Sequence, residues 1–140
     1  MTKTGGEAMT NVLYHYTSIY HLPTILETGF LKLTESNLRI DIEMHKPVVW
    51  ATTTKEPNGY GLGLDGSMVD KTEIRIHLRK NNNFMHWSRF KKQNKHDKNF
   101  VQAIEKNRSP KTWWVSSQII PLEDVLLIEN RYTGEIYYKQ

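Results

Sequence analysis

The sequence predicts an α+β domain in which strands outnumber helices, and two observations lead to this class. Short runs of β-branched, aromatic or alternating polar and apolar residues recur between Gly, Pro, Asn and Asp, a pattern typical of strands and turns. Only a few short stretches carry apolar residues at the three- or four-residue spacing of an amphipathic helix. Strands in the majority, with helices inserted between them, indicate an α+β fold.

The first elements can be placed from local signals. Residues 1–10 are small and polar, and we expect a disordered extension there. The β-formers of residues 12–16 predict a first strand. Thr17 or Ser18 then offers an N-cap for a helix that Gly29 would end. The apolar face expected for that helix consists of Ile19, Leu22, Ile25 and Leu26.

The middle of the chain predicts three more strands, at residues 30–33, 48–53 and 72–78. The last of these alternates polar and apolar residues, with an inward row of Ile74, Ile76 and Leu78. A polar helix or loop is expected at 34–46. Residues 56–66 hold one proline and four glycines and predict a loop long enough to cover a site.

The last part of the chain returns to strands after a helical region. Apolar spacing in residues 84–104 predicts two short helices with basic outer faces. A strand is expected at 112–117, and residues 119–128 read as a turn into another strand. Residues 129–131 and 136–138 predict a closing hairpin.

Length and composition set limits on the function. A chain of 140 residues is the size of one domain, which we place at residues 11–140. The absence of cysteine excludes a disulfide framework, a thiolate nucleophile and any Cys-ligated metal site. The start of the chain does not show a signal-peptide pattern, and its apolar runs are far too short to span a bilayer. We therefore expect a cytoplasmic protein.

The net charge of +4 hides an uneven distribution. Residues 79–111 hold ten Lys and Arg against two acidic residues, a net of +8, whereas the rest of the chain holds nine against thirteen, a net of −4. We expect residues 79–111 to be a basic helical insertion that binds a polyanion such as nucleic acid, or a host protein. A solvated lysine-rich face is the alternative. The residues assigned to this nucleic-acid-binding role are Arg89, Lys91, Lys92 and Lys95.

The sequence contains no strong metal or phosphate-loop motif. The six histidines form no pair spaced three to five residues apart within one element, so a metal site is not predicted. The glycine-rich residues 59–63 lack the Lys-Ser/Thr ending of a P-loop. They form either a flexible surface loop or a lid over a ligand, with Tyr60 as a stacking residue.

His15 is the most informative single residue. It lies in the first strand between Tyr14 and Tyr16, and the hydroxyls of Thr17 and Ser18 follow where that strand ends. Such a junction gathers an imidazole, hydroxyls and backbone N–H groups, which suit a phosphate or ribose. A purely structural histidine is the other interpretation.

Residues 13–18 (LYHYTS), followed by residues 22–31 (LPTILETGFL), resemble the opening of the ADP-ribosyltransferase superfamily. The resemblance is closest to the DarT-type DNA-modifying toxins and the RNA 2′-phosphotransferases. It implies a mixed, mostly antiparallel split sheet of the ADP-ribosyltransferase type, and NAD as the cofactor. Transfer of ADP-ribose to a nucleic acid or a protein is the activity it implies.

The resemblance also implies roles for individual residues. His15 would bind a ribose of NAD and act in catalysis, and the backbone at Tyr16 and Thr17 would hold the nicotinamide amide. An aromatic strand ending in Ser or Thr is the second family motif, and residues 49–53 fit it. The remaining cofactor-binding residues are then Thr52, Thr53, the stacking Tyr60 and, at the end of the late strand, Gln118.

The third family motif, a glutamate at the start of the late strand, is not matched, because residues 111–115 (KTWWV) carry no carboxylate. Glu73, Glu123 and Asp124 lie elsewhere in the sequence. The RNA 2′-phosphotransferases work without this glutamate and use basic residues, a role that Arg75 would fill here. Whether the protein is an enzyme therefore stays open.

The alternative is a catalytically inactive fold that acts as a binding or inhibitory protein of phage or mobile-element origin. The chain also resembles small bacterial and phage proteins without a known activity. The shared segments are residues 14–18, 49–53, 70–76 and 114–121.

Overall fold

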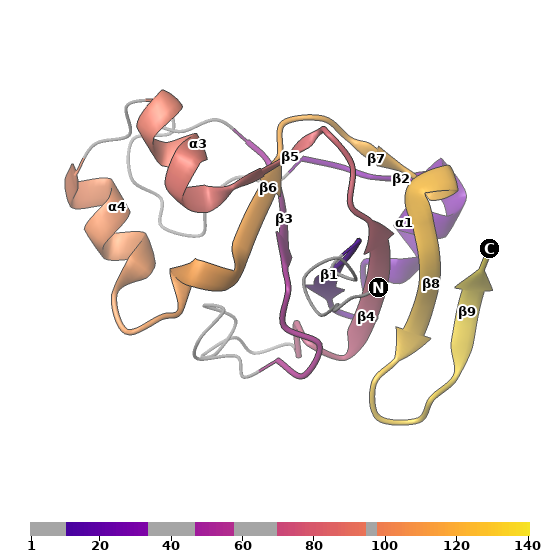
Figure 1. Cartoon of the computed structure of the whole chain (residues 1–140). Coiled ribbons are helices and arrows are strands. Elements are labelled where there is room, and N and C mark those ends of the chain that lie inside the picture. The colour runs from indigo at the N-terminus through magenta and orange to yellow at the C-terminus, as the bar shows by residue number, and fades with distance from the viewer. Residues whose placement is uncertain (1–10, 34–46, 58–69, 95–97) are drawn as a thin grey trace, which may run out of the picture.

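The structure is a computed structural model that describes residues 11–33, 47–57, 70–94 and 98–140. Its main strands are β1 (Val12–Thr17), β3 (Val49–Thr52), β4 (Ile74–Arg79), β5 (Phe84–His86), β6 (Trp113–Ser116), β8 (Val125–Asn130) and β9 (Ile136–Lys139). They form one seven-stranded sheet in the order β5-β6-β3-β1-β4-β8-β9 (Figure 1). A second sheet pairs β2 (Phe30–Leu31) with β7 (Ile120–Pro121).

These sheets confirm the α+β class and the mostly antiparallel arrangement. All strand pairs that the described residues form are antiparallel, so this part of the chain does not contain the parallel pairing that a mixed sheet requires. β1 occupies the centre of the large sheet, between β3 and β4. Its register places Tyr14 opposite both Thr52 and His77, and Tyr16 opposite Arg75.

The helix α1 (Leu22–Thr28) ends as expected but begins later than expected. Gly29 caps it in the left-handed conformation at φ 84° and donates its N–H to the Ile25 carbonyl at 2.9 Å. The N-cap is His21 rather than Thr17 or Ser18, so that prediction is wrong. A turn closed by the His21 N–H and the Ser18 carbonyl at 3.1 Å separates β1 from the helix.

The first core lies between one face of the large sheet, α1 and the small sheet. The apolar row predicted on β4 faces it, because Ile74, Ile76 and Leu78 are completely buried, which confirms their inward orientation. The buried members of this core are Leu13, Leu22, Ile25, Leu31, Val49, Ala51, Ile74, Ile76, Leu78, Phe84, Ile120, Val125 and Ile128. Since Leu13 faces this core, the alternation of β1 directs His15 and Thr17 to the same face.

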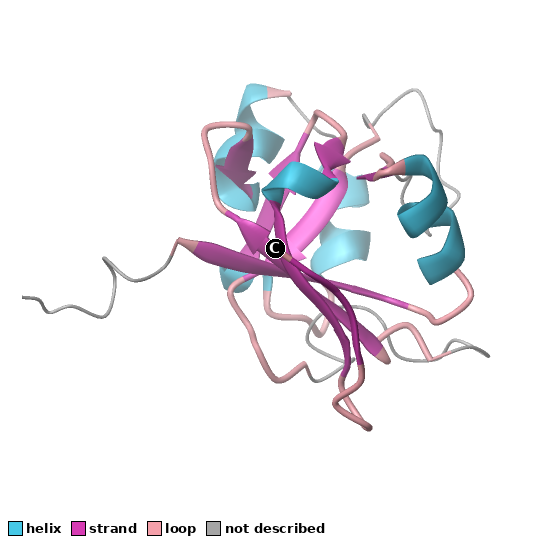
Figure 2. Ribbon diagram, turned by 90° about the vertical axis from the view of Figure 1, so that its right-hand side faces the viewer, coloured by secondary structure: helices cyan, strands magenta, loops and turns pink. Residues whose placement is uncertain are grey.

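A second core lies on the opposite face of β3 and β6, under α3 (Trp87–Gln93) and α4 (Lys98–Glu105). Helices therefore lie on both sides of the strands (Figure 2). The buried side chains of the second core are Val48, Trp87, Phe90, Phe100, Ile104, Trp113 and Val115. Each large apolar side chain buried in this way stabilises the fold by roughly 1.5–3 kcal/mol.

The basic segment, residues 79–111, contributes to the large sheet as well as to the second core. Residues 84–86 form the edge strand β5, which pairs with β6, so the prediction that a helix begins at Phe84 is wrong. The helix begins at Trp87, after the side chain of His86 accepts a hydrogen bond from the Ser88 N–H at 3.1 Å. The predicted second helix is confirmed as α4.

The end of the chain forms the predicted hairpin with one correction. β8 runs without a break to Asn130, so residues 129–130 belong to the same strand as Val125 and do not start a new one. Gly134 adopts φ 77° in the turn before β9. Among the residues that the structure describes, the helices are too short to cross a membrane.

Candidate functional site

His15 is held at the centre of the sheet by the neighbouring strand. Its Nδ1 lies 2.7 Å from the carbonyl oxygen of Trp50 on β3, and because a carbonyl only accepts, Nδ1 carries the proton. Burial lowers the pKa of His15 despite this hydrogen bond, and the nearby His21 lowers it further. A neutral ring protonated at Nδ1 presents the lone pair of Nε2, which can accept a hydrogen bond from a ligand hydroxyl.

Ser18 carries an unusual buried hydroxyl close to His15 in the chain. The residue is only 2% exposed, and its Oγ lacks a hydrogen-bond partner among the residues that the structure describes. A buried hydroxyl without a partner costs about 1–3 kcal/mol. Thr17, between the two, is also buried. The end of β1 thus combines a hydrogen-bond acceptor on His15 with an unsatisfied hydroxyl on Ser18.

The other predicted cofactor-binding residues are divided between the two faces of the sheet. His15 and Thr17 face the first core, whereas Tyr16 and Thr52 face the opposite side. Thr52 is buried, and its Oγ1 accepts a hydrogen bond from the Thr54 N–H at 3.1 Å. Thr53 is exposed. A single ligand on one face of the sheet would not meet all of these side chains.

Of the two remaining predicted cofactor-binding residues, the structure describes one. Gln118 is exposed after the end of β6, where its N–H donates to Ser116 Oγ at 3.1 Å. Tyr60 lies outside the described residues.

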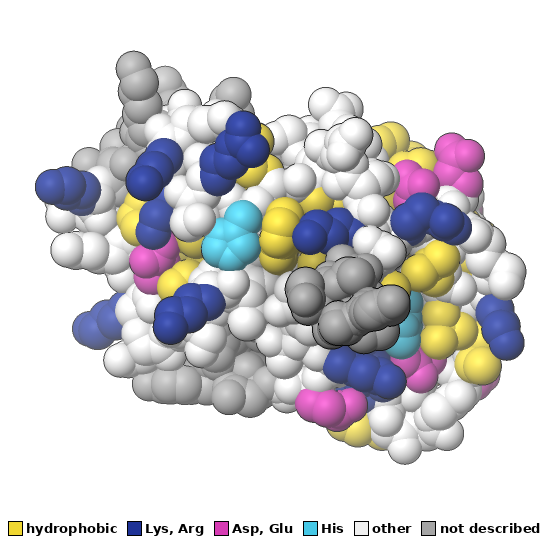
Figure 3. All heavy atoms as spheres, viewed as in Figure 1, with side chains coloured by type: hydrophobic (Ala, Val, Ile, Leu, Met, Phe, Trp, Pro, Cys, Tyr) yellow, Lys and Arg dark blue, Asp and Glu magenta, His cyan; other side chains and the backbone are white. Residues whose placement is uncertain are grey.

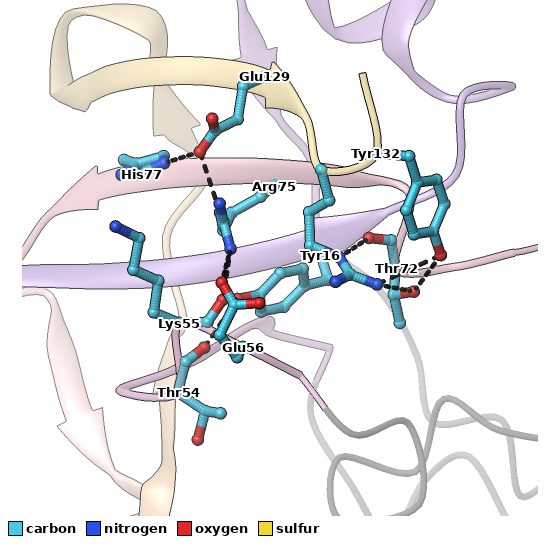
Figure 4. Close-up of polar contacts among 10 residues, drawn as sticks. Tyr16, Thr54, Lys55, Glu56, Thr72, Arg75, His77, Glu129 and Tyr132 are labelled. Atoms are coloured by element: carbon cyan, nitrogen blue, oxygen red, sulfur yellow. Dashed lines mark hydrogen bonds and ion pairs between the residues drawn. The ribbon is translucent and has the colours of Figure 1, made fainter. Parts of the chain in front are cut away.

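Tyr16 and Arg75 hold the chain segment that follows β3 (Figure 4). The Tyr16 hydroxyl lies within hydrogen-bond distance of the carbonyls of Thr54, at 2.8 Å, and Lys55. Arg75 Nη1 donates to the Lys55 carbonyl at 2.6 Å and to the Glu56 carboxylate at 3.0 Å. Burial raises the pKa of Tyr16 to about 12, although Arg75 opposes the shift.

Glu129 on β8 completes this polar network. Its Oε2 accepts hydrogen bonds from Arg75 Nε at 2.9 Å and from His77 Nε2 at 2.5 Å. The ring of Tyr14 meets that of His77 edge-on, with 5.1 Å between ring centroids. Burial alone would raise the pKa of Glu129, but the hydrogen bonds from His77 and Arg75 outweigh it and lower the pKa.

Sequence reasoning found Arg75 but missed its partners His77, Glu129 and Glu56. The alternation of β4 is a signal for His77, because it puts residues 75 and 77 on one face. No local pattern indicates Glu129, which becomes a neighbour only through the pairing of β4 with β8. Burial disfavours the charge on Arg75, yet the hydrogen bonds to Glu129 and Glu56 raise its pKa. The guanidinium is therefore committed to protein contacts.

The late strand β6 carries no carboxylate on either face. Of the three acidic residues considered instead, Glu73 accepts a hydrogen bond from Asn130 Nδ2 at 3.0 Å and Asp124 accepts one from Asn81 Nδ2 at 3.4 Å. Glu123 is exposed. None of the three lies on β6, so the glutamate that the resemblance requires at its start is not replaced there.

The tryptophans of β6 face opposite sides of the sheet. Trp113 is buried in the second core, whereas Trp114 packs against the first core. The Lys80 ammonium lies 3.9 Å from the Trp114 ring centroid, and the His86 ring meets it edge-on at 5.2 Å. One face of Trp114 is therefore already covered by a cation.

The predicted nucleic-acid-binding residues have different environments. Arg89 and Lys92 are exposed on α3. Lys91 instead forms an ion pair with Glu105 on α4 at 2.7 Å. Lys95 lies outside the described residues. In the part of the chain that the structure describes, histidines and carboxylates do not gather into a group of three or more that could hold a metal ion.

No protein-family model, curated protein or solved structure matches this chain. Conclusions about its function therefore depend on the geometry and chemistry of its own residues.

Proposed function

We propose that the protein is ADP-ribosyltransferase-like and binds NAD or a related nucleotide at the end of β1, beside His15. The observation that carries this proposal is the buried Ser18 hydroxyl, which has no partner in the described part of the chain and lies three residues after a neutral histidine. A ligand that donates to His15 Nε2 and pairs with Ser18 Oγ would satisfy both groups. A ribose with its two adjacent hydroxyls has the donors and acceptors that this pair needs.

The strand order supports the proposal. In the sequence resemblance, the family places its three motifs on the first strand, the aromatic second-motif strand and the late strand. Here these segments are β1, β3 and β6, which are neighbours in the sheet. His15 is joined directly to β3 by its hydrogen bond to Trp50.

The reaction would transfer ADP-ribose from NAD to an acceptor. The bond between ribose C1′ and the nicotinamide nitrogen breaks, and nicotinamide leaves with the electron pair. A new bond forms between C1′ and an oxygen or nitrogen of the acceptor, whose proton is released to solvent. A hydrogen bond accepted by His15 Nε2 from a ribose hydroxyl, and one formed with Ser18 Oγ, would hold the ribose while positive charge develops at C1′.

A second candidate is nucleotide binding without turnover. It is favoured by one observation, the absence of a carboxylate from β6, since a carboxylate there would stabilise the developing positive charge. The same binding site serves both candidates, so the measurement must separate binding from release of nicotinamide.

Isothermal titration calorimetry with NAD and ADP-ribose tests the binding, and chromatography of released nicotinamide tests the turnover. The informative variants are Ser18→Ala and His15→Asn, because the Asn amide can still donate to Trp50 but lacks an acceptor in place of Nε2. We expect each variant to weaken binding about tenfold, the loss of one hydrogen bond. Ser117→Ala, at an exposed serine after β6, is the matched control and should bind as the wild type does.

Ser18→Ala can also be tested by its effect on stability, which should not fall along with the binding affinity. Removing an unsatisfied buried hydroxyl should leave the ligand-free protein as stable as before or more stable by up to about 1 kcal/mol. Weaker binding together with unchanged or higher stability supports a ligand-binding hydroxyl. Absence of binding of either nucleotide at millimolar concentration by the folded wild type rejects the proposal.

A further inference from the structure

Among the residues that the structure describes, the region of α3 and α4 has several exposed cations, and its acidic residue, Glu105, is partly buried. We call five exposed cations the α3–α4 surface: Arg89 and Lys92 on α3, Lys98 on α4, Lys106 directly after α4, and Lys111 in the turn before β6. The ion pairs of the described residues do not involve any of them. Figure 3 shows Lys and Arg side chains gathered over the part of the molecule where Figure 1 places these two helices.

The acidic residue of this region is turned inward. Glu105 Oε2 accepts hydrogen bonds from Trp87 Nε1 at 2.6 Å and from Lys91 Nζ at 2.7 Å. It is the one acidic residue between positions 79 and 111 that the structure describes. The contact pairs Lys91 with Glu105, and both side chains are partly buried. Among the described residues of this segment, the charges left without an ion pair are therefore all positive.

The exposed cations also follow the geometry of the helices. Lys98 and Gln102 on α4 and Lys106 directly after it are spaced four residues apart and all are exposed. The Lys106 N–H still donates to the Gln102 carbonyl at 3.0 Å, so the three residues form one stripe about 12 Å long. On α3, Arg89 and Lys92 are three residues apart on one side of the helix. The stripes lie on two helices that are joined through Glu105.

From this arrangement we infer that the α3–α4 surface binds the sugar–phosphate backbone of a nucleic acid. Cations interspersed with exposed amides and hydroxyls suit phosphate oxygens, which accept hydrogen bonds from Lys, Arg, Asn, Gln and Ser. Ser88, Asn99 and Gln102 supply such groups on the same two helices. Contacts of this kind position a nucleic acid without reading its sequence.

Two other anionic partners fit the surface less well. A membrane-surface helix inserts an apolar face among the lipids, but the apolar faces of α3 and α4 are buried in the second core. Interfaces with proteins are enriched in aromatic residues and depleted in lysine. The large exposed hydrophobic residues of the described chain are Tyr20, Leu26, Ile119, Tyr132 and Ile136, and none lies on this surface.

The inference does not depend on NAD, so it can fail or succeed independently of the proposed function. Fluorescence anisotropy with a labelled 30-nucleotide single strand, its duplex and the RNA of the same sequence measures binding without NAD. Five cations predict that log K falls with log salt concentration at a slope of about −3.5 for the single strand and about −4.5 for the duplex. Binding to these probes should be similar for different sequences.

Variants that neutralise pairs of cations test whether nucleic acid binds at the α3–α4 surface. Arg89→Gln/Lys92→Gln and Lys98→Gln/Lys106→Gln should each weaken binding about tenfold at 100 mM salt and reduce the slope by about 1 to 2. The matched control Lys32→Gln/Lys139→Gln removes the same charge from exposed lysines outside the segment and should bind as the wild type does. Thermal unfolding confirms that all variants remain folded.

Three results would overturn the inference. The first is absence of binding to every probe at 50 mM salt. The second is an equal loss of affinity in the control, which would mean that net charge rather than this surface binds the probes. The third is retention of wild-type affinity by both surface variants. Binding to vesicles that contain anionic lipid, lost in the same variants while nucleic acid is not bound, would assign the surface to membranes instead.

Discussion

Arg75 on β4 lies directly opposite Glu129 on β8, and its Nε donates to Glu129 Oε2 at 2.9 Å. Both side chains are largely buried, at 10% and 17% exposure. Two buried charges stabilise a fold only when each is compensated by the other and by further hydrogen bonds. Here His77, Glu56 and the Lys55 carbonyl supply those bonds. The pair therefore connects the neighbouring strands β4 and β8 to the segment after β3.

Removing one member of this pair should be far more harmful than removing both. Arg75→Leu leaves the largely buried Glu129 carboxylate with the His77 hydrogen bond but without its guanidinium partner. We expect the free energy of unfolding to fall by about 3 kcal/mol. Arg75→Leu/Glu129→Leu should be more stable than Arg75→Leu alone, as measured by urea unfolding. Glu56→Gln is the control, because its side chain is 77% exposed and its ion pair is worth less than about 1 kcal/mol. A double variant less stable than the single one would contradict this account.

His15 should make the stability depend on pH near neutrality. Burial lowers its pKa in the folded protein, so below the ordinary value of 6.5 the unfolded chain binds a proton that the folded chain does not. The free energy of unfolding should therefore be highest above pH 6.5 and fall as the pH drops below it. Urea unfolding between pH 8 and pH 5 measures the effect.

The control for this prediction is His15→Asn, which cannot titrate and should flatten the dependence. His21→Asn, at an exposed residue, should change the profile much less. An identical pH profile for wild type and His15→Asn would show that His15 does not cause the dependence.

Gly29 and Gly134 allow a test of pure backbone strain. Both adopt positive φ, 84° and 77°, and a Cβ at either position would meet no atom within 4 Å. Replacement by alanine therefore costs only the strain of the left-handed conformation, about 1 kcal/mol at each site. Gly29→Ala and Gly134→Ala should show equal losses in urea unfolding, and asparagine at either site a smaller one. A loss of several kcal/mol at one site only would indicate a steric clash instead.

The contact between Lys91 and Glu105 should support stability rather than partner binding. Both side chains are partly buried, and Glu105 also accepts a hydrogen bond from Trp87. We expect Glu105→Gln to lower the free energy of unfolding by about 1–2 kcal/mol. A double-mutant cycle with Lys91→Met should give a coupling energy of about 1 kcal/mol. A coupling energy of zero would mean that the ion pair is not stabilising.

The sequence predicts much of this fold because periodicity is local. The alternation of residues 74–78 and the position of Gly29 depend on neighbours in the chain, and both predictions are confirmed. The error at β5 has a tertiary cause. Residues 84–86 carry spacing compatible with a helix, but pairing with β6 satisfies their backbone as a strand. Local propensity does not contain that information.

The candidate site is less predictable, because it depends on long-range pairing. The sequence offers Ser18 as a helix N-cap and as one of the hydroxyls that follow His15. It does not reveal that this hydroxyl is buried without a hydrogen-bond partner among the described residues. Arg75 was expected to hold a ligand phosphate, but Glu129, 54 residues away in sequence, occupies its Nε. Only the register of β4 against β8 shows that this guanidinium is committed to the protein.

The strands β3 and β6 lie between the two cores and contribute side chains to both of them. On β3, Val49 faces the first core and Trp50 the second, and on β6, Trp114 and Trp113 do the same. Because these two strands contribute side chains to both cores, unfolding of one core exposes apolar residues on strands that also support the other core. The stability of α3 and α4 is therefore coupled to that of the central sheet. The helices should consequently exchange their amide hydrogens in the same cooperative unit as β3 and β6. If α3 and α4 were transferred alone to another protein, they would lose the side chains of β3 and β6 against which they pack, and we expect them not to fold there.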